Sequence, residues 1–252
     1  TDPEQVSRLM GNKQADFIYL DSPYNISLSY DKGISKTKDY GGQHSSKKDS
    51  LNDADFHEFL KASIGSAIKI AAPNAHMLYW CDAKYISDIQ ILYKEHNVLF
   101  RRLCFWVKNN QNVTPKVAFN RVHEPAIYGT IGKPYLNEKL KSHNEVLNQD
   151  VSSGNQLHNE ILDMLDLWLV KRDDVQSYLH PTQKPVGLSE KPLRRCTAPG
   201  HIVFSGFGGS GSDLIACEQL KRKWYGVELD PVFASVIIDR WEQFTKLTAK
   251  RV

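Results

Sequence analysis

The 252-residue sequence has few cysteines, few glycines and prolines and no long apolar run, and each shortage excludes a class of protein. Its 15 glycines and 11 prolines are too few for a fibrous protein. Its four cysteines are far apart, without a CxxC pair or a histidine at metal-ligand spacing: Cys81, Cys104, Cys196 and Cys217. This spacing argues against a disulfide scaffold and against a zinc site. No stretch approaches the roughly 18 uninterrupted apolar residues of a membrane span, and the first residues are not a signal peptide. We therefore expect a globular cytoplasmic protein with reduced thiols and no metal site.

Excess charge of one sign is also nearly absent. The chain has 32 Lys and Arg against 29 Asp and Glu, but residues 101–150 have eight basic residues against four acidic ones. A local excess of this size fits a phosphate-facing surface, and charge alone fits a solvated face with scattered lysines equally well.

Short apolar runs alternate with helical patterns along the chain. This alternation predicts repeated β-α units, a mainly parallel sheet and an α/β fold. We expect strands near 17–20, 75–80, 99–107, 122–128, 202–204 and 224–228, and helices near 53–72, 83–96, 188–197, 212–220 and from 231. Residues 22–50 are polar and predict a long functional loop. Residues 137–179, with an amphipathic piece at 161–169, have the composition of an insertion rather than of core.

A glycine-rich turn, Gly206-Phe207-Gly208-Gly209-Ser210-Gly211, follows the predicted strand 202–204. Strand, glycine-rich turn, helix and a second strand ending in an acidic residue form an adenosine-binding arrangement in α/β sheets. Glu228, 17 residues after Gly211, is that acidic residue and can accept both ribose hydroxyls. Taken alone, the pattern fits a tight strand-to-helix connection better. No Lys-Ser or Lys-Thr follows the last glycine, so the turn is not a phosphate-binding P-loop.

A second motif, Asp21-Ser22-Pro23-Tyr24, follows the first predicted strand. An aspartate there points from the carboxyl edge of the sheet, where ligands bind in open α/β folds. Pro23 holds Ser22 in an extended conformation, which can direct its carbonyl outward beside the Asp21 carboxylate. Two acceptors and an aromatic ring suit a planar amino group. In isolation, four such residues fit an Asx-type turn better.

The order of the motifs along the chain favours a functional site over two unrelated turns. Asp21-Ser22-Pro23-Tyr24, then His180-Pro181-Thr182-Gln183-Lys184-Pro185, then the glycine-rich turn resemble the β group of DNA amino-methyltransferases. The resemblance runs from about residue 16 to 241 and includes weaker blocks at 106–109 and 123–125. It implies methyl transfer from S-adenosylmethionine to the exocyclic amine of adenine or cytosine in DNA. The implied fold is Rossmann-like, with a mostly parallel seven-stranded sheet, helices on both faces and the catalytic motif before the cofactor motif.

The resemblance also assigns roles to individual residues. Asp21 and the Ser22 carbonyl would accept hydrogen bonds from the target amine, Pro23 would shape the turn, and Tyr24 would stack on a base that has left the duplex. The cofactor would be bound by Phe207, Gly208, Gly209, Ser210, Gly211, Glu228, Thr182, Lys184 and, through the adenine, Asp2. This chemistry is positioning and electrostatics, without a metal.

The sequence departs from the pattern of the family at four positions, in three places. Ser22 replaces the first proline of the catalytic motif, which keeps the carbonyl. Ser205-Gly206 replaces the Asp-Pro of the family's D-P-F-x-G-S-G signature, and Asp213 stands where the family usually has threonine. Loss of a carboxylate near a cationic cofactor weakens binding, so a catalytically degenerate nucleic-acid-binding subunit is an alternative hypothesis. Asp213 itself is in the first turn of a predicted helix, where negative charge is favourable.

The remaining expectations concern the substrate. We predict a single methyltransferase domain, 1–252, with a target-recognition insertion at 109–178, and contacts to double-stranded DNA from Lys108, Asn109, Lys116 and Arg121. The Asp-initial motif favours adenine N6 as target, with cytosine N4 as the alternative and RNA or a protein amide as a further one. The family context predicts a bacterial or phage-like restriction-modification enzyme that modifies and does not cut. A homodimer is left open.

Overall fold

The computed structural model describes residues 2–26, 50–112, 116–137, 165–174, 179–180 and 182–251. Within these residues seven strands form one mixed sheet in the order β5-β3-β4-β2-β1-β6-β7. The strands are β1 (Ala15–Asp21), β2 (Ala71–Trp80), β3 (Leu99–Asn112), β4 (Arg121–Ile131), β5 (Leu167–Leu169), β6 (Ile202–Ser205) and β7 (Lys223–Gly226). The helices are α1 (Pro3–Met10), α2 (Asp53–Ile68), η2 (Ala83–Tyr85), α3 (Ile86–Glu95), α5 (Val186–Cys196), α6 (Ser212–Gln219) and α7 (Pro231–Thr245).

Among the described strands, β4 alone runs antiparallel to its neighbours. It pairs antiparallel with β2 and β3, whereas β1-β2, β1-β6, β3-β5 and β6-β7 are parallel pairs. The start of β4 therefore lies at the same sheet edge as the carboxyl ends of the other strands. This arrangement confirms the predicted α/β fold with a mostly parallel sheet.

Strand β1 divides its side chains between the two faces of the sheet. Ile18 and Leu20 enter one hydrophobic cluster, and Phe17 and Tyr19 enter the other, as the two-residue period of a strand requires. All four are buried. A central strand that is apolar on both sides needs helices on both faces, which is why its sequence is an uninterrupted apolar run.

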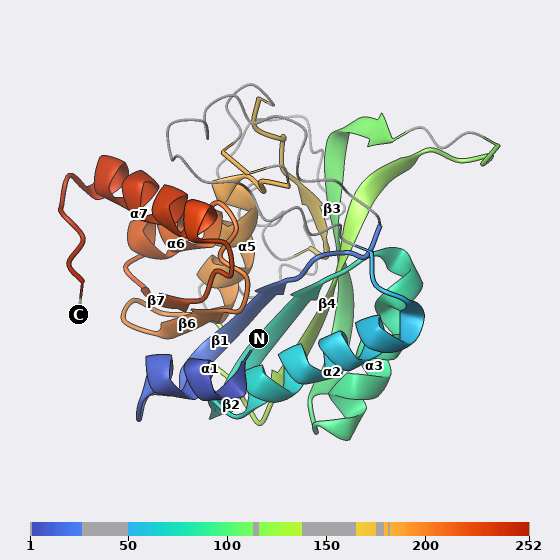
Figure 1. Ribbon diagram of the computed structural model, residues 1–252. Coiled ribbons are helices and arrows are strands. Elements are labelled where there is room, and N and C mark those ends of the chain that lie inside the picture. Colours follow the sequence, from blue (N-terminus) through green and yellow to red (C-terminus); the bar gives the residue numbers. More distant parts are fainter. Residues whose placement is uncertain are drawn as a thin grey trace.

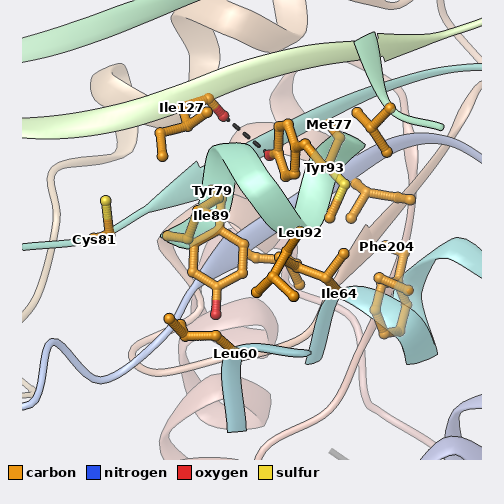
Figure 2. Close-up of a cluster of buried hydrophobic side chains, with 14 of the residues drawn as sticks. Leu60, Ile64, Met77, Tyr79, Cys81, Ile89, Leu92, Tyr93, Ile127 and Phe204 are labelled. Carbon is orange, nitrogen blue, oxygen red and sulfur yellow. Dashed lines mark hydrogen bonds between the residues drawn. The ribbon is translucent and has the colours of Figure 1, made fainter. Parts of the chain in front are cut away.

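The first cluster lies under α1, α2 and α3 (Figure 1). Figure 2 shows Leu60 and Ile64 of α2 and Leu92 of α3 gathered around Tyr79 of β2. The Tyr93 hydroxyl on α3 donates to the carbonyl of Ile127 on β4 at 3.1 Å, which satisfies the one polar atom of a buried ring. Burial of each large aliphatic side chain contributes roughly 1.5–3 kcal/mol, so this cluster fixes α2 and α3 against the sheet.

The opposite face is covered by α5 and α6, and α7 packs beside α6 (Figure 1). Leu188 and Leu193 of α5 and Ala216 of α6 are completely buried there. Pro192 lies inside α5, whose last turn has two arginines near the helix carbonyls. The helices on this side place the segment before α5 and the glycine-rich turn before α6 at the same end of the sheet.

Part of the predicted insertion 109–178 is sheet core, which corrects that prediction. It contains all of β4 and the short strand β5, which pairs in parallel with β3. Trp168 of β5 packs edge-on against Trp80 with ring centroids 5.6 Å apart, and the Trp106 indole donates to the Val170 carbonyl at 2.7 Å. A three-residue strand anchored by one tryptophan has too little periodicity to be recognised in a sequence.

Other expected boundaries shift by a few residues. Helix α2 ends at Ile68 rather than near residue 72, β2 begins at Ala71 rather than 75, and β3 continues to Asn112 rather than 107. Most of the predicted loop 22–50 and of the loose segment 137–179 lies outside the described residues. The four cysteines are free and buried. No helix in the described residues has the length and apolar character to span a membrane.

A buried histidine makes the fold sensitive to acid. The His76 ring, 1% exposed on β2, has Nε2 2.6 Å from the Tyr135 carbonyl and Nδ1 2.8 Å from the Tyr128 hydroxyl. Burial lowers the pKa of His76 to about 4. The pKa of this histidine in the unfolded chain is higher, about 6.5. The contribution of the neutral His76 to the free energy of unfolding is therefore complete above that pH and is lost as the pH falls toward 4.

We predict that the free energy of unfolding falls by about 2.5 kcal/mol between pH 7 and 4.5 on account of His76. The variant His76→Phe should lack this part of the pH dependence, although it is less stable at pH 7 because two hydrogen bonds are lost. Urea unfolding at pH 7 and at pH 4.5 measures the free energy of unfolding of each variant. His57→Phe, at a side chain 43% exposed, is the control. Equal acid losses in the wild type and His76→Phe would contradict the prediction.

Candidate active site

The carboxyl edge of the sheet borders a cavity of about 730 Å³. Elements distant in the sequence meet there: the end of β1, the start of β4, the segment before α5, the glycine-rich turn and the end of β7. Predicted site residues that line it are Asp2, Asp21, Ser22, Pro23, Tyr24, Lys108, Arg121, Thr182, Lys184, Phe207, Gly208, Gly209, Ser210 and Glu228. The size and mixed lining suit a small-molecule ligand.

Lys184 and Asp21 form an ion pair at the end of β1. Lys184 Nζ lies 2.5 Å from Asp21 Oδ1 and 3.0 Å from the Tyr24 hydroxyl, and it stands over the rings of Tyr24 and Trp80 at 5.0 and 5.1 Å from their centroids. The Lys184 side chain is 7% exposed. The Lys184 nitrogen thus occupies an amine-binding position formed by the Asp21 carboxylate and the rings of Tyr24 and Trp80, which we call the amine seat.

A second carboxylate, Glu124 on β4, completes the charge balance. Its Oε1 is 3.0 Å from Lys108 Nζ, and its Oε2 is 3.1 Å from the Tyr24 hydroxyl and 3.6 Å from Lys184 Nζ. Lys108 is buried on β3. Lys108, which the sequence predicted as a nucleic-acid contact, lines the cavity, and its ammonium is paired with Glu124.

The neighbouring charges set the pKa values of the two carboxyl groups in opposite directions. Burial raises the pKa of Asp21, and the Lys184 ammonium only partly opposes this. Burial would also raise the pKa of Glu124, but Lys184 and Lys108 together bring it below its usual range. The surroundings therefore favour the ionised form of Glu124, whereas burial makes Asp21 easier to protonate than a free aspartate.

Lys184 also connects the two halves of the site. Its carbonyl accepts a hydrogen bond from the Ser212 hydroxyl at 2.6 Å, at the start of α6. The backbone of this residue contacts the glycine-rich half while its side chain contacts the catalytic half. The resemblance assigned Lys184 to the cofactor, and the structure places its ammonium against Asp21, the predicted catalytic residue.

The glycine-rich turn approaches α7 more closely than side chains allow. A Cβ at Gly208 would lie 2.7 Å from the Ile237 Cδ1 atom, and Gly209 and Gly211 have φ angles of 54° and 74°. Gly211 has no part in the cavity lining; it packs on Ile237. These glycines let the turn close tightly at the mouth of the cavity.

Glu228 stands at the end of β7, facing that turn. Its Oε2 accepts from the Gly209 amide at 2.7 Å and its Oε1 from the Asp230 amide at 2.9 Å. Burial raises the pKa of this carboxyl group. Phe207 lies beside Phe59 with ring centroids 5.8 Å apart, which gives this end of the cavity an apolar wall.

The outer cofactor residues lie at the rim of the cavity. Asp2 caps α1 by accepting from the Glu4 amide at 2.9 Å. Thr182 is exposed, and its hydroxyl is 3.1 Å from His180 Nδ1. Arg240 of α7 donates to the Ser210 carbonyl at 3.0 Å. Among the described residues no group of His, Cys, Asp and Glu side chains could bind a metal ion.

The two departures near the turn face one another. Asp213 is 5% exposed, accepts from the Trp224 indole at 2.8 Å and shares a hydrogen bond with the Ser205 side chain. Burial raises its pKa. A carboxylate and a hydroxyl are thus both present here, but on the opposite positions from those of the signature D-P-F-x-G-S-G and its threonine.

The other predicted nucleic-acid contacts lie along β3 and β4. Arg121 Nη1 is 2.5 Å from Asp82 Oδ2 at the mouth of the cavity. Asn109 Oδ1 accepts from the Arg172 amide at 3.3 Å. Lys116 is exposed, with a φ angle of 65°. Arg121 lines the cavity, whereas Asn109 and Lys116 are farther along the hairpin.

Comparison with known proteins decides the family. Residues 15–239 match the sequence model of the family described as DNA methylase. The chain belongs to this DNA methylase family. It is 25% identical over 246 residues to the type II methyltransferase M2.DpnII of Streptococcus pneumoniae, covering 92% of this chain and 84% of the relative. It is 23% identical over 226 residues to the type II methyltransferase M.HpaI of Haemophilus parainfluenzae, covering 89% of this chain and 67% of that one.

Solved structures agree on the fold. The crystal structure of the M1.HpyAVI-SAM complex matches with a TM-score of 0.61 at 23% identity, covering 95% of this chain and 96% of that one. The PvuII DNA methyltransferase, titled cytosine-N4-specific, matches with a TM-score of 0.65 at 14% identity, covering 96% and 88%. The DNA methylase fold predicted from the ordered motifs is confirmed.

The residues of this methylase fit S-adenosylmethionine, the methyl donor of the family. A Cβ at Gly209 would meet nothing within 4 Å, so the turn leaves open space at this glycine, and the Glu228 carboxylate that binds its amide suits two ribose hydroxyls. Phe207 provides an apolar surface for a planar base. The cofactor supplies an activated methyl group on a sulfonium.

Sequence reasoning missed Glu124 and Trp80 as site residues. The block His123-Glu124-Pro125 was part of the resemblance, but nothing in one chain indicates that its glutamate reaches Lys184 across the sheet. Trp80 ends β2 in an apolar run and has the pattern of an ordinary core residue. The usable signal was the presence of two lysines in the motifs, since buried lysines require carboxylate partners.

We predict that Glu124→Gln lowers the free energy of unfolding of the methylase by about 2–3 kcal/mol, because the buried Lys108 ammonium then loses its carboxylate and Lys184 keeps only Asp21. The double variant Lys108→Met with Glu124→Gln removes one charge of each sign and should recover at least about 1 kcal/mol of this loss. Urea unfolding measures both. If the double variant were less stable than Glu124→Gln, the charge balance would not be what stabilises this cluster.

Proposed function

We propose that the protein methylates the N6 amine of adenine in double-stranded DNA. The observation that carries the proposal is the amine seat at the end of β1. There Lys184 Nζ contacts the Asp21 carboxylate at 2.5 Å beside the Tyr24 ring. A seat that binds one amine by a carboxylate and an aromatic face suits the amine of a nucleobase.

The chemistry required of the protein is modest. The exocyclic amine is a poor nucleophile because its lone pair is delocalised into the ring. Hydrogen bonds to Asp21 and the Ser22 carbonyl favour a tetrahedral nitrogen with its lone pair directed at the methyl group. Bound S-adenosylmethionine would supply the methyl carbon for the new bond to nitrogen and keep the electron pair of the broken bond on its sulfur. The Asp21 carboxylate, which accepts a hydrogen bond from the amine, would take the proton that the nitrogen loses. Positioning and electrostatics supply the rate enhancement.

Lys184 must leave the seat when the base enters. Glu124 Oε2 is 3.6 Å from its ammonium, so a small rotation gives Lys184 a full ion pair there. The departure frees Asp21 without leaving a buried ammonium unpaired, which would be costly. In this proposal Lys184 pairs with Glu124 while the base amine is bound to Asp21, so the exchange of the two amines leaves no charge unpaired and has a small free-energy cost.

Adenine is proposed over cytosine because the catalytic motif begins with Asp21. Asp-initial motifs are commoner among adenine enzymes of this family, and Ser-initial ones among cytosine enzymes. The alternative, methylation of cytosine N4, uses the same seat and the same acceptors, and the PvuII enzyme of similar fold is titled as such an enzyme. Analysis of the product distinguishes the two.

Asp213 argues for an active enzyme over a degenerate DNA-binding subunit. The signature carboxylate is replaced by Ser205, but the buried Asp213 carboxylate contacts that serine and lines the same cavity. We propose that Asp213 gives the cationic cofactor the negative charge that Ser205 lacks. The hairpin residues Lys116 and Arg121 then contact the DNA, and restriction-modification is the proposed context.

We expect the wild type to transfer labelled methyl groups from S-adenosylmethionine to unmethylated duplex DNA, and Asp21→Ala to lose at least about 1000-fold in kcat, since it removes the main amine acceptor. Asp88→Ala, at a partly exposed carboxylate on α3, is the matched control and should retain full activity. Product digestion should give N6-methyladenine. N4-methylcytosine instead would refute the base assignment, and no transfer by the wild type would refute the enzyme.

The exchange between positions 205 and 213 is tested by a double-mutant cycle. Ser205→Asp adds a second carboxylate beside Asp213, and Asp213→Thr leaves none, so each should weaken S-adenosylmethionine binding at least about 10-fold in calorimetry. The double variant restores one carboxylate and should bind within about threefold of the wild type, a coupling of about 2 kcal/mol or more. Additive losses would contradict the exchange, and no binding by the wild type at millimolar cofactor would favour the degenerate subunit.

A further inference from the structure

Phe119 is an aromatic side chain in an unusual setting. It is 87% exposed, more than any other large apolar side chain in the described residues, and it precedes β4 by two residues. Val117 beside it is 54% exposed. An isolated exposed apolar residue needs no explanation, but two at the end of a projecting hairpin form a surface that solvent does not favour.

The position of Phe119 follows from the direction of β4. Because β4 is antiparallel to β2, its first residues lie at the catalytic edge, and Asn112 of β3 pairs with Arg121 there. Figure 1 shows the residues that lead into β4, 116–120, extending outward beyond the neighbouring strands. Phe119 is five residues from Glu124, so at most about 17 Å of extended chain separates it from the amine seat.

The surroundings of Phe119 favour nucleic acid over a protein partner. Lys116 is exposed at the same tip, and Arg121 lies at its base, paired with Asp82. The described tip, residues 116–120, contains no acidic residue. An apolar side chain between cations has the composition of DNA-binding elements that insert a wedge between bases while neighbouring charges contact phosphates.

We propose that Phe119 enters the base stack at the place that the target nucleotide leaves. This rests on the proposed function, because a base can reach the amine seat only by leaving the duplex. Departure of the base opens a gap whose faces are apolar. A phenyl ring that fills the gap restores stacking on both sides and keeps the nucleotide from returning. Phe119 is thus a positioning residue for DNA, and it does not contact the reacting atoms.

The test compares paired and unpaired targets. The recognised sequence is first identified from the methylated positions in plasmid DNA modified by the wild type; if none is methylated, the proposed function fails before the wedge is tested. Single-turnover methylation is then measured on a matched duplex and on one in which an abasic site faces the target base. We expect Phe119→Ala to lose at least about 10-fold on the matched duplex and less than about threefold on the abasic one.

Two further variants control for folding and for ring chemistry. Phe119→Leu keeps an apolar wedge and should retain at least about one third of the wild-type rate on the matched duplex. Phe244→Ala removes another exposed phenyl ring, 45% exposed on α7, and should behave as the wild type on both duplexes. Fluorescence of 2-aminopurine at the target position should rise on binding of the wild type and much less with Phe119→Ala.

The wedge is refuted by either of two results. Equal losses of Phe119→Ala on both duplexes would show a general defect of binding or folding. Unchanged rates on both, with a change of oligomeric state in analytical ultracentrifugation, would show that the exposed ring belongs to an interface between copies of the chain.

Discussion

Two buried lysines paired with two partly exposed carboxylates at one edge of the sheet constrain how the strands of this edge and the segment before α5 come together. Lys184 lies between Asp21 and Glu124, and Lys108 closes the cluster behind Glu124. Charges in such a place are tolerated only when each is paired, because desolvation costs several kcal/mol per ion. The partners come from β1, β3, β4 and the segment before α5, so the cluster forms only when all four converge. It therefore positions the catalytic end of β1 relative to the second half of the chain.

Two further features turn that constraint into a site. The antiparallel direction of β4 brings Glu124 and Arg121 to the same edge as Asp21, and a parallel β4 would have placed them at the opposite end. The Ser212 hydroxyl binds the Lys184 carbonyl, which links the cluster to the first turn of α6 and so to the glycine-rich turn. Amine seat and cofactor turn are thus held at a fixed separation by one residue, and methyl transfer requires that separation.

The sequence was sufficient wherever function depends on a local pattern. The apolar run of β1, the turn at Asp21 and the glycines before α6 are short-range signals, and the structure brings them to one edge. It was insufficient where a side chain acts across the sheet. Lys108 has the pattern of a surface lysine until Glu124 is placed 3.0 Å away, and Trp168 marks a strand only because Trp80 packs on it. The orientation of β4 is not encoded by its own periodicity, which is the same in either direction.

The pair formed by Ser205 and Asp213 has a consequence for how relatives are found and how they diverge. A search that requires an aspartate at the strand end discards this chain, although the carboxylate is still beside the strand, supplied from α6. The intermediate sequences between the two arrangements contain either two adjacent buried carboxylates or none. If Asp213 supplies the charge that Ser205 lacks, as proposed, both intermediates bind the cofactor less well, so positions 205 and 213 have to change together to keep one carboxylate beside the strand.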